Sequence, residues 1–284
     1  MAIFVHDQLE EIIETVLYSA RIKDSVPVSI LLIAKSGTAK SALIKQYQGP
    51  NIHPCDSFSS QGMWDTAISD QKNEIAFMTV PDMNPTLSRK PSTVQSVIAN
   101  LLTLLYDGSV RINDGRREKM CKHSPIGLIS AVTPEIYRAN AKRWLWLGIR
   151  RRIIPLFFEY SNETIRLLQG HVRKGKIHSA LNGKKTIVLP KPYTCAIDER
   201  HGVFLEAEST AFSVTLGKNG TWDKSNSKMA WIDSGLVPVS PHLTLRSLAQ
   251  AHARRDNRAK VNDSDIDFIC RFRDFSDPEN PKKI

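Results

Sequence analysis

Val28-Ser-Ile-Leu-Leu-Ile-Ala-Lys-Ser-Gly-Thr-Ala-Lys-Ser41 is the stretch of sequence that decides the fold. Its first six residues are mostly apolar, which is long enough for one buried strand and too short for a typical helix. Pro27 precedes this run, where a proline does not disturb the start of a strand. A glycine-containing loop follows, and Ser41 to Tyr47 is expected to form a helix. The order strand, loop and helix is typical of α/β proteins.

The loop after this strand carries the residue types that bind phosphate. A phosphate-binding loop follows the pattern Gly-x-x-x-x-Gly-Lys-Ser/Thr, in which backbone N–H groups surround phosphate, the lysine contacts it and the hydroxyl ligates Mg²⁺. Alanine replaces both glycines here, at Ala34 and Ala39, and alanine is strained wherever φ must be positive. The pattern predicts binding of ATP with Mg²⁺ by Ser36, Gly37, Thr38, Ala39, Lys40 and Ser41. The alternative is an ordinary strand-turn-helix without a ligand.

Alternating apolar strands and helices predict a parallel sheet covered by helices on both faces. Further strands are expected at residues 75–80, 126–132 and 152–158, and helices at residues 7–22, 92–106 and 163–173. We divide the chain into an α/β nucleotide-binding core (1–165), a linker and loop-rich connecting region (166–240) and a C-terminal helical lid (241–284). In the connecting region, polar residues 217–228 are expected to form a loop. The lid is expected to contain helices at 243–255 and 264–271, the second capped by Asp263.

An aspartate follows the second strand, where an ATPase of this kind holds Mg²⁺ through water. This residue is Asp82, which we assign to the metal together with Ser41. Met83 comes next, so no carboxylate adjoins Asp82, and Asn84 can orient a water without accepting its proton. Either Asp82 serves alone or another acid such as Glu135 contributes. The sequence therefore predicts an ATPase whose hydrolysis is slow.

Two later stretches resemble AAA+ ATPases of the minichromosome-maintenance-like helicase group: Gly127 to Pro134, and Leu147 to Phe157. The resemblance implies that Thr133 contacts the γ-phosphate and that Arg152 reaches the nucleotide of a neighbouring subunit, with Arg151 and Arg150 close behind. A third stretch, residues 243–266, is similar to the helical lid of that group. There Arg246 matches either a nucleotide-contacting arginine (sensor 2) or a core-flanking arginine one turn later.

A basic hairpin is expected from Ser109 to Met120, around the turn sequence Asn113-Asp114-Gly115. In the same group this place is taken by a hairpin that contacts DNA inside a hexameric ring. The candidate nucleic-acid contacts are Arg111, Arg116, Arg117, Lys119 and Lys122. A formal net charge of +10 also favours polyanionic partners. The alternative is a solvated basic loop.

Other functional classes are not favoured by the sequence. No apolar stretch is long enough to span a membrane, the N-terminus lacks the pattern of a secretory signal, and the four cysteines form no metal-binding pair. We therefore expect a cytoplasmic protein. The leading hypothesis is an oligomeric, ring-forming ATPase that engages nucleic acid as a helicase, loader or remodelling motor. The alternatives are a hydrolysis-deficient regulatory or scaffold subunit that binds DNA, and a basic DNA-binding protein without a nucleotide site.

Overall fold

A computed structural model of the chain describes residues 7–57, 59–69, 74–113, 118–173, 183–223, 228–233 and 239–284. It contains a six-stranded sheet in the order β12-β8-β1-β7-β4-β3, in which every neighbouring pair is parallel. The strands are β1 (Ser29–Ile33), β3 (Ile52–Pro54), β4 (Phe77–Val80), β7 (Gly127–Val132), β8 (Ile153–Glu159) and β12 (Lys282–Lys283). The predicted parallel sheet is thus confirmed.

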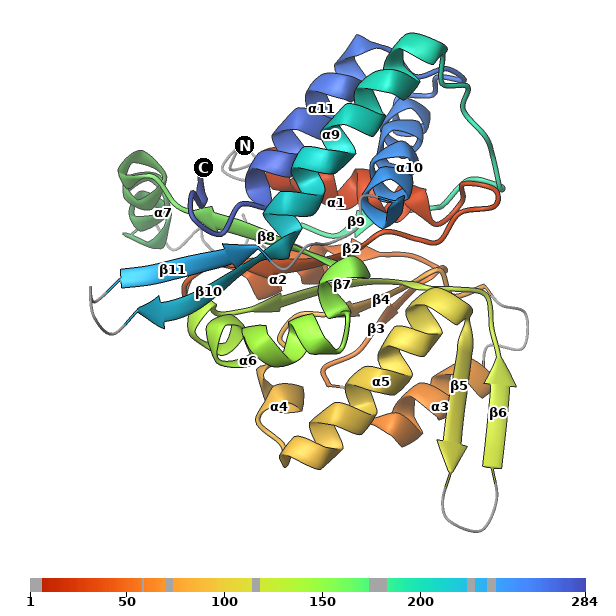
Figure 1. Cartoon of the computed structure of the whole chain (residues 1–284), viewed down its shortest axis with the longest axis vertical. Coiled ribbons are helices and arrows are strands. Elements are labelled where there is room, and N and C mark those ends of the chain that lie inside the picture. Colours follow the sequence, from red (N-terminus) through yellow and green to blue (C-terminus); the bar gives the residue numbers. More distant parts are fainter. Residues whose placement is uncertain are drawn as a thin grey trace.

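Helices cover both faces of the sheet (Figure 1). One face carries α1 (Asp7–Ser19), α2 (Lys40–Gln46), α9 (Glu199–Gly217), α10 (Val239–Arg255) and α11 (Asp263–Phe275). The other face carries α3 (Ser60–Ser69), the short α4 (Asn84–Leu87), α5 (Pro91–Asp107) and α6 (Pro134–Trp146). In β1, Ile30 and Leu32 belong to the first core while Leu31 and Ile33 belong to the second. Burial on both faces explains why this strand is a continuous apolar run.

The three C-terminal helices form a layer with α1. Helix α10 packs against α1, α9 and α11, and α11 also contacts β8. Phe212 of α9 and Phe272 of α11 meet with ring centroids 6.1 Å apart, and both are fully buried. The two helices expected after residue 241 are thus present as α10 and α11, whose core is continuous with that of the sheet, while the chain ends in the strand β12. A turn of 3₁₀-helix, η2 (Ile149–Arg151), precedes β8, and α7 (Asn162–Arg173) follows it.

Three local predictions were wrong. The described part of residues 217–228 does not form a loop: β10 (Lys218–Asp223) and β11 (Lys228–Asp233) pair antiparallel, because a hairpin obtains its hydrogen bonds from its partner strand without a long apolar run. Helix α9 lies in the region expected to be loop-rich, and its pattern is obscured by the exposed Val203 and Val214. The cap of α11 is Asn262 instead of Asp263, since Asn262 accepts from the Ser264 N–H at 3.1 Å.

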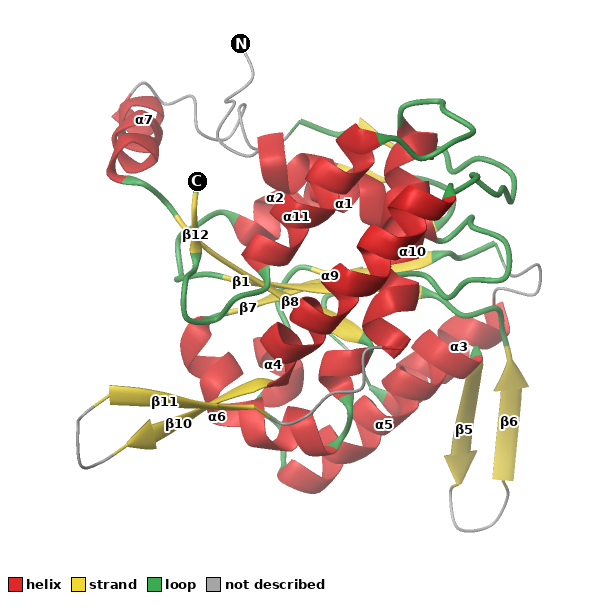
Figure 2. Ribbon diagram, turned by 45° about the horizontal axis from the view of Figure 1, so that its top comes forward, coloured by secondary structure: helices red, strands yellow, loops and turns green. Residues whose placement is uncertain are grey.

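The predicted basic hairpin is confirmed as β5 (Ser109–Asn113) and β6 (Glu118–Lys122), and it projects beyond the helices that flank the sheet (Figure 2). Gly108 ends α5 with a φ of 60°, which favours glycine. A Cβ atom at Gly108 would lie 2.0 Å from the carbonyl oxygen of His123, so the entry into the hairpin has no room for a side chain. The short strands β2 (Tyr47–Gln48) and β9 (Lys185–Thr186) form one further parallel pair.

Candidate nucleotide site

The glycine-containing loop lies at the carboxyl edge of the sheet, between β1 and α2. Strand β7 separates β1 from β4, so the ends of these three strands lie side by side at one edge. Lys40, Thr133 and Asp82 follow these ends within a few residues. Ligands of open α/β sheets bind outside this edge. Three of the predicted nucleotide-site residues are therefore brought together by the strand order.

Lys40 is buried, with 8% of its surface exposed, and its ammonium group is turned back into the loop. Its Nζ donates to the carbonyl oxygens of Ala34 (2.5 Å) and Lys35 (2.8 Å) and to the Thr38 hydroxyl (3.1 Å). These partners carry no formal charge. Burial lowers the pKa of Lys40 to about 8, while the charges of Asp82 and Glu135 oppose the shift. A buried cation with neutral partners is suited to an incoming anion.

Ser41 and Asp82 supply two oxygen ligands next to Lys40. The Ser41 hydroxyl donates to the carbonyl oxygen of Pro81 at 2.9 Å, which fixes it beside the residue that precedes Asp82. Asp82 accepts from the Asn84 N–H at 2.9 Å and keeps a carboxylate oxygen for other partners. No cluster of three or more metal-ligating side chains occurs among the described residues. A hydroxyl and one carboxylate fit Mg²⁺, which takes few protein ligands and shares phosphate oxygens.

The loop adopts positive φ angles at Gly37 (83°) and Ala39 (54°). For an alanine this left-handed conformation costs about 1 kcal/mol. Part of what holds the loop is the end of β8: the Tyr160 hydroxyl donates to the Thr38 carbonyl oxygen at 2.5 Å, and Glu159 forms an exposed ion pair with Lys35 at 3.6 Å. Sequence reasoning missed Tyr160, because its only signal is its position directly after the strand.

Thr133 and Glu135 stand at the start of α6, next to the loop. The Tyr137 N–H donates to the Thr133 carbonyl oxygen at 3.0 Å, so Thr133 precedes the first turn of the helix. A hydrogen bond from its own backbone N–H, and a second from the Thr133 hydroxyl, lower the pKa of Glu135. The charge of Lys35 acts in the same direction. Glu135 is thus an exposed, ionised carboxylate whose charge acts on Lys40 and Lys35 of the phosphate loop.

Met83, which follows Asp82, points into the protein interior. It is 2% exposed and belongs to the core beneath α5 with Val80 and Val94. Its N–H donates to the Ala131 carbonyl oxygen at 3.0 Å, and its own carbonyl accepts from the Thr86 N–H. The backbone therefore directs this position away from the candidate site. The Met83 side chain therefore does not line the candidate site.

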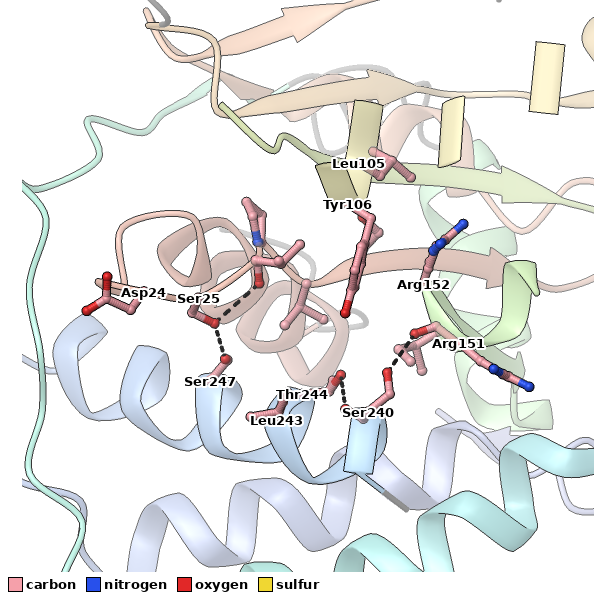
Figure 3. Close-up of a pocket in the computed structure, with 15 residues that line it drawn as sticks. Asp24, Ser25, Leu105, Tyr106, Arg151, Arg152, Ser240, Leu243, Thr244 and Ser247 are labelled. Carbon is pink, nitrogen blue, oxygen red and sulfur yellow. Dashed lines mark hydrogen bonds between the residues drawn. The ribbon is translucent and has the colours of Figure 1, made fainter. Parts of the chain in front are cut away.

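The three arginines before β8 differ in their surroundings. Arg150 is 3% exposed and packs its guanidinium 5.5 Å from the centre of the Tyr137 ring, which suits a structural role. Arg151 is exposed. Arg152 lies over the Tyr106 ring, with its guanidinium carbon 5.0 Å from the ring centre (Figure 3). Both Tyr106 and Arg152 line a pocket of about 140 Å³, which is smaller than nucleotide-sized pockets.

Arg152 and Lys40 lie at opposite ends of the parallel strands: Arg152 at their amino ends and Lys40 at their carboxyl ends. Arg152 precedes β8, whose first residue Ile153 pairs with Ser29, the first residue of β1. The length of the five-residue strand β1, about 16 Å at 3.3 Å per residue, separates this edge from the phosphate loop. The structure therefore does not bring Arg152 to Lys40 within one chain.

Arg246 lies in a part of α10 that is also at the amino edge of the sheet. Ser240 Oγ donates to the Arg151 carbonyl oxygen at 3.3 Å, and Ser247 Oγ lies 2.5 Å from Ser25 Oγ in the segment before β1 (Figure 3). Arg246 is partly buried between these two contacts. The contacts around it do not join it to the phosphate loop.

The predicted nucleic-acid contacts are only partly described. Arg116 and Arg117 lie outside the described residues, as do the side chains of Arg111 and Lys119. Lys122 is exposed at the end of β6. The strand register places Arg111 and Lys122 at positions on one face of the hairpin and Lys119 on the other, because Arg111 pairs with Met120 while Lys119 pairs with Ile112. In sequence register, these three positions are thus divided between the two faces of the hairpin.

In comparisons with known proteins, the chain matches no family model and no curated protein. Over the part of the chain that the structure describes, no helix has the length and apolar character needed to cross a membrane. The functional assignment therefore rests on the residues at the carboxyl edge.

Proposed function

We propose that the protein binds ATP with Mg²⁺ at the carboxyl edge of its sheet and hydrolyses it, as an ATPase of the AAA+ type. The observation that carries this proposal is the environment of Lys40. This lysine is a buried cation at the start of α2, directly after the loop, and all of its hydrogen-bond partners are neutral. Thr133 and Asp82 lie on the neighbouring strand ends. The pattern of the loop and the strand order support the same conclusion independently.

Each residue has a distinct role in this proposal. The backbone from Ser36 to Ala39 surrounds the phosphates, and Lys40 exchanges its carbonyl partners for phosphate oxygens. Ser41 and Asp82 hold Mg²⁺, which neutralises charge on the phosphates when it is bound. Thr133 donates a hydrogen bond to the γ-phosphate. The C-terminal helices α10 and α11 are the proposed lid of the site.

Nucleotide binding is tested by replacing Lys40 with alanine. Lys40→Ala removes the positive charge that phosphate requires, and we expect ATP affinity to fall at least about a hundredfold, as for loss of a buried charge-assisted contact. Lys45→Ala is the matched control, since Lys45 is an exposed lysine on the same helix, and it should bind ATP as the wild type does. Titration with a fluorescent ATP analogue measures both. Wild-type affinity in Lys40→Ala would refute a nucleotide site at this loop.

The position of Arg152 supports action between subunits, because it is a strand length away from its own phosphate loop. In the proposed ring, Arg152 of one subunit completes the site of the next, and Arg246 acts from the same interface. Arg152→Ala should lower ATP turnover by about a thousandfold, as for an arginine that stabilises transferred phosphate. Equimolar mixing with Lys40→Ala should restore part of the turnover, since each variant then supplies what the other lacks. The control is a mixture of Arg152→Ala with the double variant Lys45→Ala/Arg152→Ala. It should restore no ATP turnover, because neither variant supplies Arg152.

Nucleic acid is the proposed partner of the basic hairpin, and the protein would act on it as a helicase, loader or remodelling motor. The net charge of +10 and the projection of β5 and β6 favour this partner. ATP turnover measured with and without single-stranded DNA, beside the native mass of the oligomer, tests it. Stimulation of turnover by DNA in a ring-sized oligomer would support a motor.

A second candidate is a nucleotide-binding regulatory or scaffold subunit that does not hydrolyse ATP. The buried Met83 favours it, because the position after Asp82 cannot supply a carboxylate to the site. Tight ATP binding, DNA binding and turnover at the background rate would favour this candidate over the motor.

A further inference from the structure

Hydrolysis at the proposed site needs a group that accepts a proton from the attacking water. Met83 cannot contribute, because its side chain lies in the core beneath α5. The Asn84 amide can orient a water molecule but is not a base. Asp82 is assigned to the metal, where its charge is shared. The proton acceptor must therefore come from another element.

Two carboxylates act on Lys40 through their charge: Asp82 and Glu135. Glu159, a third acid near the loop, forms an ion pair with Lys35 on the β8 side. Glu135 instead starts α6, directly after β7, and β7 is the strand between β1 and β4. Its position is therefore central among the three strand ends. Of these three acids, Glu135 alone faces the loop without a metal role or an ion pair.

The place of Glu135 in the fold suits a base. Glu135 is the second residue of α6, two residues after Thr133, the residue that is proposed to contact the γ-phosphate. The short separation in sequence keeps Glu135 near the position proposed for the transferred phosphate. Glu135 is exposed, so its side chain can exchange protons with solvent after each turnover.

We propose that Glu135 accepts the proton of the attacking water during ATP hydrolysis, in place of an acid next to Asp82. This proposal rests on the proposed ATPase function. The water oxygen forms a bond to the γ-phosphorus while the bond from that phosphorus to the β,γ-bridging oxygen breaks. ADP leaves with the electron pair of the broken bond. The water proton moves to Glu135, which then releases it to solvent or to the phosphate product.

The test is Glu135→Gln, measured by ATP titration and by single-turnover hydrolysis of ATP bound beforehand. We expect affinity within about threefold of the wild type and a hydrolysis rate lower by about 10²–10⁴-fold, the usual contribution of a general base. Glu163→Gln is the matched control, because Glu163 is an exposed glutamate at the second position of α7, as Glu135 is of α6. It should hydrolyse ATP at the wild-type rate.

Three outcomes would overturn the proposal. They are a wild-type rate in Glu135→Gln, a loss of ATP affinity that accounts for its lost turnover, and a wild-type protein that binds ATP without hydrolysing it. None of these refutes the nucleotide site itself, which fails only if Lys40→Ala still binds ATP. Partial activity in Glu135→Asp, which keeps the carboxylate at a shorter reach, would support the proposal further.

Discussion

Lys40 and Asp265 are both buried charges, yet their surroundings are opposite. Lys40 contacts only carbonyl oxygens and a hydroxyl, and its pKa is lowered to about 8. Asp265 is fully buried. Its carboxylate accepts hydrogen bonds from Nη1 and Nη2 of Arg258, both at 2.6 Å, and lies 2.6 Å from His252 Nδ1. Its pKa is lowered by these hydrogen bonds although burial opposes the shift. The hydrogen-bond partners of the first charge are all neutral, whereas those of the second include two cationic side chains.

This difference in charge pairing distinguishes the candidate nucleotide site around Lys40 from the structural cluster around Asp265. The cluster around Asp265 continues through His252 to Glu11, at 3.1 Å, and Glu11 also pairs with Arg271 at 3.0 Å. The hydrogen bond from His252, assisted by Arg271 and Arg255 and opposed by burial, lowers the pKa of Glu11 to about 2. These contacts join α1, α10 and α11 and leave no charge unsatisfied among them. A buried charge that has ionic partners makes the loss of any one partner costly, whereas a buried cation with neutral partners can accept an anionic ligand.

The largest expected effect comes from breaking the neutralised cluster. Asp265→Ala leaves Arg258 and His252 without their shared partner and should lower the free energy of unfolding by about 3–5 kcal/mol. Asp267→Ala is the control, because Asp267 is an exposed aspartate of the same helix and should cost under about 0.5 kcal/mol. Urea unfolding measures both. A similar small loss in the two variants would show that the cluster does not hold the helical layer.

The same contrast explains what could be predicted from the sequence. The strand and loop from Val28 to Ser41 were predictable, because burial on both faces imposes a continuous apolar run and the loop residues are adjacent in sequence. The cluster was not, since His252 and Glu11 are 241 residues apart and only the packing of α10 on α1 joins them. The same limit applies within the site. Nothing in the sequence indicates that Tyr160 binds the Thr38 carbonyl oxygen or that Met83 points inward.

The next effect sharpens the contrast through pH. Because the pKa of free Lys40 is about 8, raising the pH from 7 to 9 deprotonates it, and ATP affinity should fall about tenfold. Bound phosphate keeps the lysine charged, so ATP binding at pH 9 should take up close to one proton. Calorimetry in two buffers of different ionisation enthalpy measures this uptake.

The stability of the unliganded protein should rise with pH where ATP affinity falls. The unfolded state keeps the Lys40 proton up to its ordinary pKa of 10.5, while the folded state loses it near 8. Stability contributed by this group therefore rises with pH between these values. Lys40→Met, which cannot titrate, should lack this rise when urea unfolding is repeated across that range. An unchanged pH dependence in Lys40→Met would assign the effect to other groups.

The smallest effect concerns the loop backbone that holds Lys40. Ala39 has a φ of 54°, a conformation that glycine adopts without strain, so Ala39→Gly should relieve about 1 kcal/mol. Glycine also raises the entropy of the unfolded chain, which offsets part of the gain. We expect a net increase in the free energy of unfolding of up to about 0.5 kcal/mol. Ala42→Gly, three residues later inside α2, should instead lower it by about 1 kcal/mol, because glycine is unfavourable in a helix interior. Opposite signs at two alanines of one segment would show that the loop is held in a glycine-like conformation by its neighbours, and equal losses would refute it.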